Sequence, residues 1–306
     1  MAQVTAQLVK ELREMTGAGM MDCKKALVEA TGDMEQAVVL LREKGLSKAE
    51  KKSGRIAAEG LVRLCFDADH RKAAMVEVNS ETDFVAKNPE FIDFVEKLAA
   101  RALSQKTNDM DAFLESTYEG DKKIKEALTD KVAKIGENLK IRRIQSFATP
   151  GVVYVGYLHG GGRIGVIIGL ETEGSYEEVL TTGKDVAMQV ASMNPEFLDE
   201  SQVSTAWLEK ETEIARQQLL NEGKKAELID RIIPGKIKAL YKEVCLVDQK
   251  FVKNADMTVK AYVDSQAKEL GKPIRIAEMA RFEVGEGLEK KSEDFAAEVA
   301  ATVGQK

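Results

Sequence analysis

The sequence predicts an α+β fold: a small helical module, a core of two related α+β halves with antiparallel sheets, a projecting helical hairpin and a short C-terminal helical module. Three patterns predict it. Apolar residues recur at helical spacing over residues 1–54, apolar and polar residues then alternate from Gly60, and the order strand, turn, strand, helix occurs twice. With 44% hydrophobic, 31% charged and 6% aromatic residues among 306, the composition excludes wholesale disorder.

Residues 1–54 predict three short helices. Residues 21–30 form the second, and Asp33 is placed to cap the third. The lysine-rich run 46–55, LSKAEKKSGR, predicts a linker that tethers this thin-cored module. In the first helix, four apolar residues follow helical spacing before the turn TGAG: Val4, Leu8, Leu12 and Met15.

From Gly60 the chain predicts a β-hairpin with one buried face. Residues 62–66 and 74–78 alternate apolar and polar positions on either side of the turn DADH, so Glu77 alternates with the buried positions. A helix follows, with Asn88 as its cap and Pro89 at its first position.

The same order recurs from Gly151. Residues 153–157 and 164–170 alternate around the turn HGGGRIG, and a helix follows over residues 176–193. Two such halves, each with helices covering one face of a sheet, make the α+β core. Between the halves, residues 109–142 predict a helical stretch that ends in VAKIGENLKIRR.

Residues 204–246 predict a helical hairpin that projects from the second half. Ser204 can cap its first helix, and both NEGKK and the pair Pro234–Gly235 interrupt the helical pattern. A last strand covers residues 274–283, and a short helix over residues 292–301 begins with acidic side chains that the helix dipole favours. The predicted domain limits are 1–54 for the helical binding module with its linker, 55–147 and 148–203 for the two halves, 204–246 for the hairpin, 247–285 for the continued second half and 286–306 for the C-terminal module.

Charge and cysteine content narrow the class of protein. The chain has 45 Lys and Arg residues against 51 Asp and Glu, a net charge of -6, so direct nucleic-acid binding is disfavoured. Its three cysteines are far apart and odd in number, which predicts reduced thiols. Neither a long apolar run nor a signal-peptide pattern occurs, so we expect a cytoplasmic protein with no membrane partner.

Catalytic and metal-binding patterns are missing from the sequence. There are two histidines, His70 and His159, both in or beside predicted turns, and no CxxC or HExxH zinc motif. The glycines of HGGGRIG match GxGxxG, but a strand follows them where a dinucleotide site needs a helix, so we assign them to a hairpin turn. We therefore expect no enzyme, cofactor or metal site, although a cysteine–histidine enzyme stays open because such partners meet only in space.

Two runs contain apolar residues whose presence is not explained by packing of the core alone. In LREMTGAGMMDCKKAL, Met20 and Met21 are adjacent, so their side chains point about 100° apart and cannot be equally buried. We expect one in the core and the other on an adaptable binding surface. In EVNSETDFVAKN, Phe84 is either a hydrophobic plug beneath the next helix or, beside Asp83, an aromatic interface anchor.

Together these runs resemble elongation factor Ts, the family of guanine-nucleotide exchange factors of bacterial and organellar translation. Further segments resemble the family in the same order along nearly the whole chain: VAKIGENLKIRR, HGGGRIGV, VDQKFVKNADMTV and RFEVGEGLEKKSEDFAAEVA. The resemblance implies that the N-terminal module is ubiquitin-associated-like, and it supports the two-half core, the arm and the C-terminal module.

The resemblance also implies a partner, the GTPase elongation factor Tu, whose GDP the chain would release by disturbing the magnesium–nucleotide site. The alternative is a chaperone-like or sequestering module that binds elongation factor Tu without exchange activity. The implied contacts with the GTPase domain are Arg13, Met20, Met21 and Lys24 in the N-terminal module, Thr82, Asp83, Phe84, Val85 and Ala86 near the magnesium site, and the segment 281–299. His159 would face another domain of elongation factor Tu.

Overall fold

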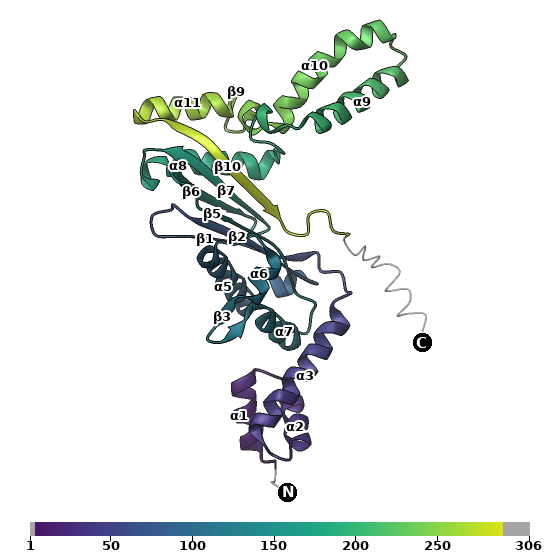
Figure 1. The fold of residues 1–306 in the computed structure, drawn as a ribbon, viewed down its shortest axis with the longest axis vertical. Helices are drawn as coiled ribbons and strands as arrows, with labels where there is room; N and C mark the ends of the chain where they lie inside the picture. The colour runs from purple at the N-terminus through teal and green to yellow at the C-terminus, as the bar shows by residue number, and fades with distance from the viewer. Residues whose placement is uncertain (1–3, 290–306) are drawn as a thin grey trace. The chain divides into compact units, whose positions relative to one another are not determined.

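The computed structural model describes residues 4–289 and contains small sheets with helices packed against them, which confirms the α+β prediction (Figure 1). Its residues divide into two compact units. Within the described part, the first unit comprises residues 4–63, 76–145 and 283–289, and the second comprises residues 64–75 and 146–282. The predicted helix over residues 292–301 lies outside the described residues.

Three helices form the N-terminal module: α1 (Ala6–Thr16), α2 (Met20–Glu29) and α3 (Met34–Lys52). Asp33 caps α3 as predicted, because its carboxylate accepts the N–H of Gln36 at 2.9 Å. The core of the module is small and centres on Leu12, Cys23 and Leu27. The predicted linker is wrong over most of its length: α3 runs on to Lys52, since Lys, Ala and Glu are strong helix formers.

The first sheet has the strand order β1 (Glu59–Phe66), β2 (Ala73–Ser80), β5 (Lys140–Phe147). The predicted hairpin is confirmed, but the expectation of one buried face fails for β2, where all eight residues are buried. Neither face of β2 is therefore left to solvent, and its neighbours β1 and β5 pair with both of its edges. The helix α5 (Pro89–Gln105) follows with Asn88 as its cap, accepting the N–H of Glu90 at 2.8 Å.

The segment between the hairpin sheets is less helical than predicted. Two helices are present, α6 (Met110–Glu115) and α7 (Ile124–Ile135), but the small strands β3 (Thr117–Glu119) and β4 (Lys122–Lys123) separate them. Gly136, with φ 89°, ends α7 in the left-handed region that favours glycine. The closing residues KIRR belong to β5, in which Ile141 and Ile144 are buried on the sheet instead of continuing a helical face.

In the second unit, β6 (Val152–His159) pairs with β7 (Ile164–Thr172) in antiparallel register, with His159 opposite Ile164. A strand therefore leaves the glycine turn, as expected, and not a nucleotide-binding helix. The predicted helix α8 (Tyr176–Met193) packs on this hairpin so closely that a Cβ on Gly183 would lie 2.5 Å from Val155. The last predicted strand is confirmed as β10 (Ile274–Glu283), and the strand order is β10, β7, β6.

The internal repeat goes further than the sequence predicted. The chain after the arm also forms β8 (Lys250–Phe251), β9 (Asn254–Thr258) and α11 (Val259–Leu270), which the sequence analysis missed. Gly271 ends α11 in the left-handed region, just as Gly136 ends α7, and the third strand of the sheet follows each glycine. In both sheets this late strand lies beside the second strand of the hairpin.

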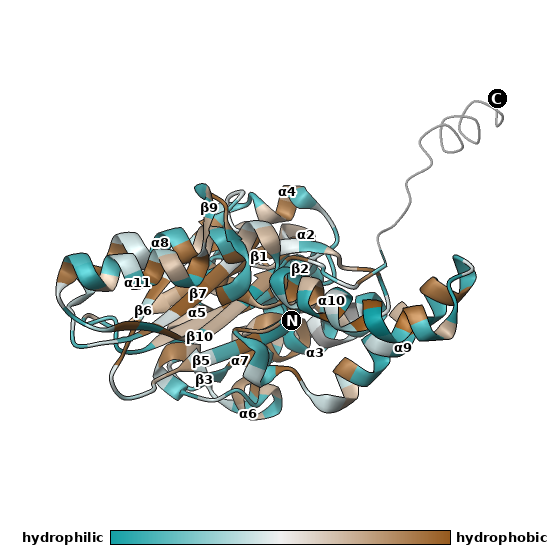
Figure 2. Cartoon of the chain, turned by 90° about the horizontal axis from the view of Figure 1, so that it is seen from above, coloured by the Kyte–Doolittle hydropathy of each residue, from teal (hydrophilic) through white to brown (hydrophobic). Residues whose placement is uncertain are grey.

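The predicted arm consists of α9 (Thr205–Asn221) and α10 (Ala226–Val244), which lie side by side (Figure 1). Ser204 caps α9 by accepting the N–H of Trp207 at 3.2 Å. Pro234 does not interrupt α10, although it lacks the N–H of a regular helix turn, because α10 packs on α9 through Leu219, Ile229 and Ile233. Figure 2 shows hydrophilic and hydrophobic residues interspersed along both helices, whereas hydrophobic residues dominate β7. Short 3₁₀ turns, Glu200–Gln202 and Leu246–Asp248, flank the arm.

Candidate partner-binding site

The chain after β2 forms a helix of only four residues, α4 (Asp83–Ala86). On it Phe84 is 80% exposed, while its neighbour Val85 is 8% exposed. The hydrophobic plug considered for Phe84 is therefore wrong, because Val85 fills that role. Adjacent side chains on a helix point about 100° apart, so burial of Val85 turns Phe84 outward.

Polar groups orient the rest of this turn. The carboxylate of Asp83 accepts a hydrogen bond from Lys87 at 2.6 Å, one helical turn ahead. Thr82 precedes α4 at the capping position, but its hydroxyl donates to Glu137 at 2.6 Å and makes no cap for α4. Thr82, Asp83 and Ala86 are each partly exposed, so their polar and backbone atoms can be reached from solvent.

The N-terminal module exposes more apolar surface than expected. Met20 is 58% and Met21 is 63% exposed, so the expectation that one of them is buried is wrong. Both lie at the start of α2, before its first buried residue, Cys23. Arg13 on α1 and Lys24 on α2 are also exposed. Both methionines can therefore contact a partner with their flexible side chains.

The two histidines differ in their surroundings. His159 is exposed at the end of β6, where its Nδ1 lies 3.1 Å from the hydroxyl of Tyr157. His70 is stacked between Phe66 and Tyr176, with ring centroids 5.0 Å and 3.5 Å away. His159 is thus open to a partner, and His70 is part of the packing of the second unit, to which both belong.

The cysteines have properties opposite to those of a nucleophile. Burial raises the pKa of the thiols of Cys23 and Cys65, and it raises the pKa of Cys245 to about 11. Over residues 4–289, no three His, Cys, Asp or Glu side chains gather in a group that could hold a metal ion. Nor does that part of the chain have a helix both long and apolar enough to span a membrane.

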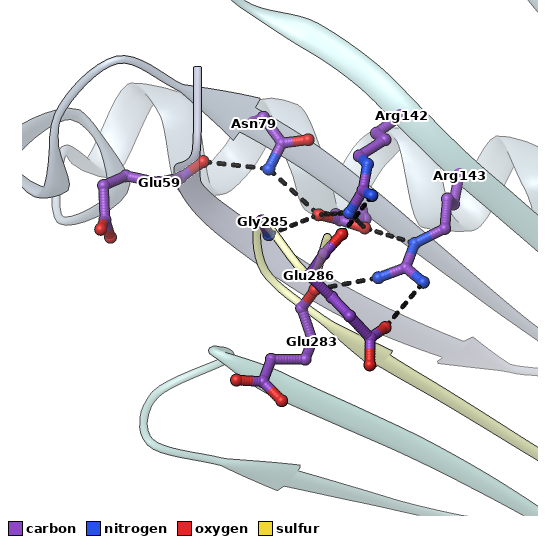
Figure 3. Close-up of polar contacts among 8 residues, drawn as sticks. Glu59, Asn79, Arg142, Arg143, Glu283, Gly285 and Glu286 are labelled. Atoms are coloured by element: carbon purple, nitrogen blue, oxygen red, sulfur yellow. Dashed lines mark hydrogen bonds and ion pairs between the residues drawn. The ribbon is translucent and has the colours of Figure 1, made fainter. Parts of the chain in front are cut away.

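A buried ionic network, which the sequence analysis missed, is centred on β2, the strand that leads into residues 81–87, the Phe84 turn (Figure 3). Glu77 is fully buried, and its carboxylate accepts hydrogen bonds from Arg142 at 3.1 Å and Arg143 at 2.5 Å. It also accepts from the side-chain amide of Asn79 at 3.0 Å and from the N–H of Gly285 at 2.9 Å. The alternating pattern placed Glu77 on the outer face; the adjacent arginines of KIRR were the signal for a buried partner.

The two arginines extend the network to the last residue of β10 and the chain that follows it. Arg143 donates to the backbone carbonyl of Glu283 at 2.9 Å and to the carboxylate of Glu286 at 3.1 Å, and Arg142 donates to the backbone carbonyl of Glu286. The network thereby fixes the beginning of the segment 281–299, of which residues 290–299 lie outside the described part of the chain.

A family model described as elongation factor TS matches residues 81–286, which include the Phe84 turn, Glu137 and both arginines. The chain belongs to the elongation factor Ts family. Elongation factor Ts of Clostridioides difficile strain 630 is 54% identical over 98% of this chain and 99% of the relative. That of Clostridium novyi strain NT is 50% identical over 99% of this chain and 100% of the relative.

Membership of the elongation factor Ts family makes the chain a translation elongation factor. The residues that the sequence predicted for partner binding fall into three groups. One group lies on α1 and α2, the second surrounds α4, and His159 belongs to the second unit. Of these ten residues Val85 alone is buried, so it anchors the turn to the core, and in the predicted segment 281–299 Phe282 and Val284 are buried as well.

Proposed function

We propose that the chain binds elongation factor Tu and promotes release of its GDP by disturbing the magnesium–nucleotide site. The observation that carries this proposal is the exposure of Phe84, 80%, on a turn whose next residue is anchored in the core. Large aromatic side chains are rarely left in water without a partner, and they dominate protein interfaces. Family membership supports the choice of partner, because elongation factor Ts is generally known as the nucleotide exchange factor of elongation factor Tu.

The energetics require more than one contact. Weakening nucleotide binding about 10⁴-fold needs roughly 5.5 kcal/mol of differential binding. Burying the exposed part of Phe84 provides about 1 to 2.5 kcal/mol, so other contacts must contribute. We infer that Arg13, Met20, Met21 and Lys24 of the N-terminal module and His159 of the second unit provide them.

The mechanism is reciprocal coupling between two ligands of the GTPase. If the factor weakens GDP binding by a given ratio, GDP must weaken binding of the factor by the same ratio. A ternary complex can therefore lose either ligand. Asp83 and Phe84 would act by shifting elements that hold magnesium, since the ion is the largest local charge on the phosphates.

Release of labelled GDP from elongation factor Tu tests the exchange activity. With the factor present at a small fraction of the GTPase concentration, we expect accelerated release. Tight binding without acceleration would replace exchange by the chaperone-like or sequestering alternative.

A titration of variants tests the division of roles. Replacing Arg13 or Met20 should weaken docking, so that a higher concentration of the factor restores the rate. Replacing Asp83 and Phe84 together should lower the plateau rate at saturation, because these residues act after docking. If the double variant reached the wild-type plateau, the turn would be an ordinary anchor and the action on magnesium would lie elsewhere.

A further inference from the structure

We propose that Glu137 is a positioning residue that holds the Phe84 turn in its partner-binding conformation. The inference rests on the proposed function, and it concerns a residue that never touches the partner in this scheme. Glu137 lies in the connection between α7 and β5, far along the chain from the turn that it contacts.

The turn has few stabilising interactions of its own. The helix α4 has four residues, fewer than a stable helix nucleus requires, and its capping residue makes no side-chain bond to the N–H groups of α4. The anchoring of Val85 fixes one side of the turn only. Where the chain enters α4 from β2, Ser80 donates to the carbonyl of Thr82 at 2.9 Å, but the N–H groups of Glu81 and Thr82 still need an acceptor.

Glu137 is that acceptor, and it uses both carboxylate oxygens. Oε2 accepts the backbone N–H groups of Glu81 and Thr82, each at 3.0 Å. Oε1 accepts the hydroxyl of Thr82 at 2.6 Å. Hydrogen bonds to an ionised carboxylate are shorter and stronger than neutral ones, and three of them at successive donors fix both the path and the rotation of the chain.

These hydrogen bonds form a clamp between residues 81–82 and residues 137–138, and bonds run across it in both directions. Glu81 accepts the backbone N–H of Asn138 at 2.6 Å, so each connection supplies one carboxylate to the other's backbone. The side-chain amide of Asn138 in turn donates to the carbonyl of Arg55 at 2.8 Å. Gly136 sets the position of Glu137, because its left-handed conformation turns the chain out of α7. The two connections are therefore locked to each other without using any surface of Phe84.

This geometry makes pre-organisation the function of Glu137. A turn that is already ordered loses less conformational freedom on binding, and the apparent affinity falls in proportion to the fraction of molecules in the competent conformation. Removing the clamp should therefore lower activity only through Phe84 and its neighbours.

The first test measures order in the free protein. In Glu137→Ala, hydrogen–deuterium exchange of the amides of residues 81–87 should become at least tenfold faster. The matched control is Glu178→Ala: Glu178 also accepts a backbone N–H beside a helix cap, that of Ser175 at 2.7 Å, but it lies in the second unit. It should leave the exchange of residues 81–87 unchanged. Unchanged exchange in Glu137→Ala would overturn the proposal.

The second test measures GDP release from elongation factor Tu. Glu137→Ala should lower the rate at subsaturating factor about tenfold, whereas in a background in which Asp83 and Phe84 are both replaced by alanine it should cause no further loss. An equal loss in both backgrounds would show a general structural role and overturn the proposal. If Phe84→Ala itself did not affect the rate of GDP release, the proposed function would fail. The hydrogen–deuterium exchange of residues 81–87 would still test whether Glu137 orders the turn.

The variant Glu137→Gln keeps the size of the side chain and one acceptor oxygen, and it carries both tests if the alanine variant does not fold. We expect a smaller acceleration of amide exchange at residues 81–87 and a smaller loss of GDP release. Wild-type values in both measurements would contradict a role for the carboxylate.

Discussion

Replacing Glu77 by alanine should destabilise the protein by about 3 kcal/mol or more, which follows from counting the donors that lose their acceptor. Glu77 accepts two buried neutral donors, the side-chain N–H of Asn79 and the backbone N–H of Gly285. A buried donor left without a partner costs about 1 to 3 kcal/mol. Arg142 and Arg143 would keep the backbone carbonyls of Glu286 and Glu283 as acceptors, so each arginine would lose only part of its hydrogen bonding. The expected loss of stability therefore lies in the lower part of the range for a broken buried ion pair, about 3 to 5 kcal/mol.

Urea unfolding followed by circular dichroism measures this loss as a shift of the midpoint. The matched control is Glu115→Ala in the same unit, because Glu115 also pairs with two cations, Lys123 and Lys125, but is exposed. Solvent screens such a pair, so the control should unfold close to the wild type. If Glu77→Ala lost less than about 1 kcal/mol, the reasoning that buried donors depend on this carboxylate would be refuted.

Three further predictions follow from individual residues. Phe84→Ala should lower GDP release about tenfold or more yet change the free energy of unfolding by less than about 0.5 kcal/mol, since the ring is exposed; a large loss in urea unfolding would contradict this. Gly60→Ala should destabilise by about 1 to 3 kcal/mol in the same assay, because φ is 135° and the new Cβ would lie 2.1 Å from a carbonyl oxygen of β2. Burial alone would raise the pKa of Glu90, but hydrogen bonds from Lys131 and Lys134 outweigh it and lower the pKa. Glu90 therefore stabilises the fold above its ordinary pKa and less as the pH falls, so Glu90→Gln should show a weaker loss of stability on acidification from about pH 5 to pH 3, and an unchanged loss would count against this.

The periodicity of the sequence was sufficient for most elements, because caps and alternation are local signals. Asn88, Pro89 and Ser204 mark helix starts that the structure confirms. The alternation of apolar and polar residues gave the wrong burial for Glu77. Such a pattern predicts one buried face, and it cannot reveal that both faces of β2 are buried. The lysine-rich composition after Gly45 wrongly predicted a linker where the structure continues α3. Lysines are as common on an exposed helix face as in a linker.

The candidate site was predictable only in part. Phe84, Met20 and Met21 stand out as apolar residues in polar surroundings, and the structure leaves all three exposed. Glu137 gave no such signal, because its partners Glu81 and Thr82 come from a distant stretch of chain and charged residues are ordinary on surfaces. Contacts of that kind follow from the fold and not from any local pattern.

The late arrival of the third strand in each sheet bears on how the chain folds during synthesis. The hairpin β6–β7 emerges long before β10, which completes the sheet only after the arm and α11 have been made. Until then β7, a central strand in the finished protein, has an unpaired edge that can recruit other chains. Pairings between distant segments also slow folding, because a long loop must close first. The first sheet closes much earlier, once β5 has followed α7, so the nascent chain should acquire its two halves in sequence, with the second aggregation-prone for longer.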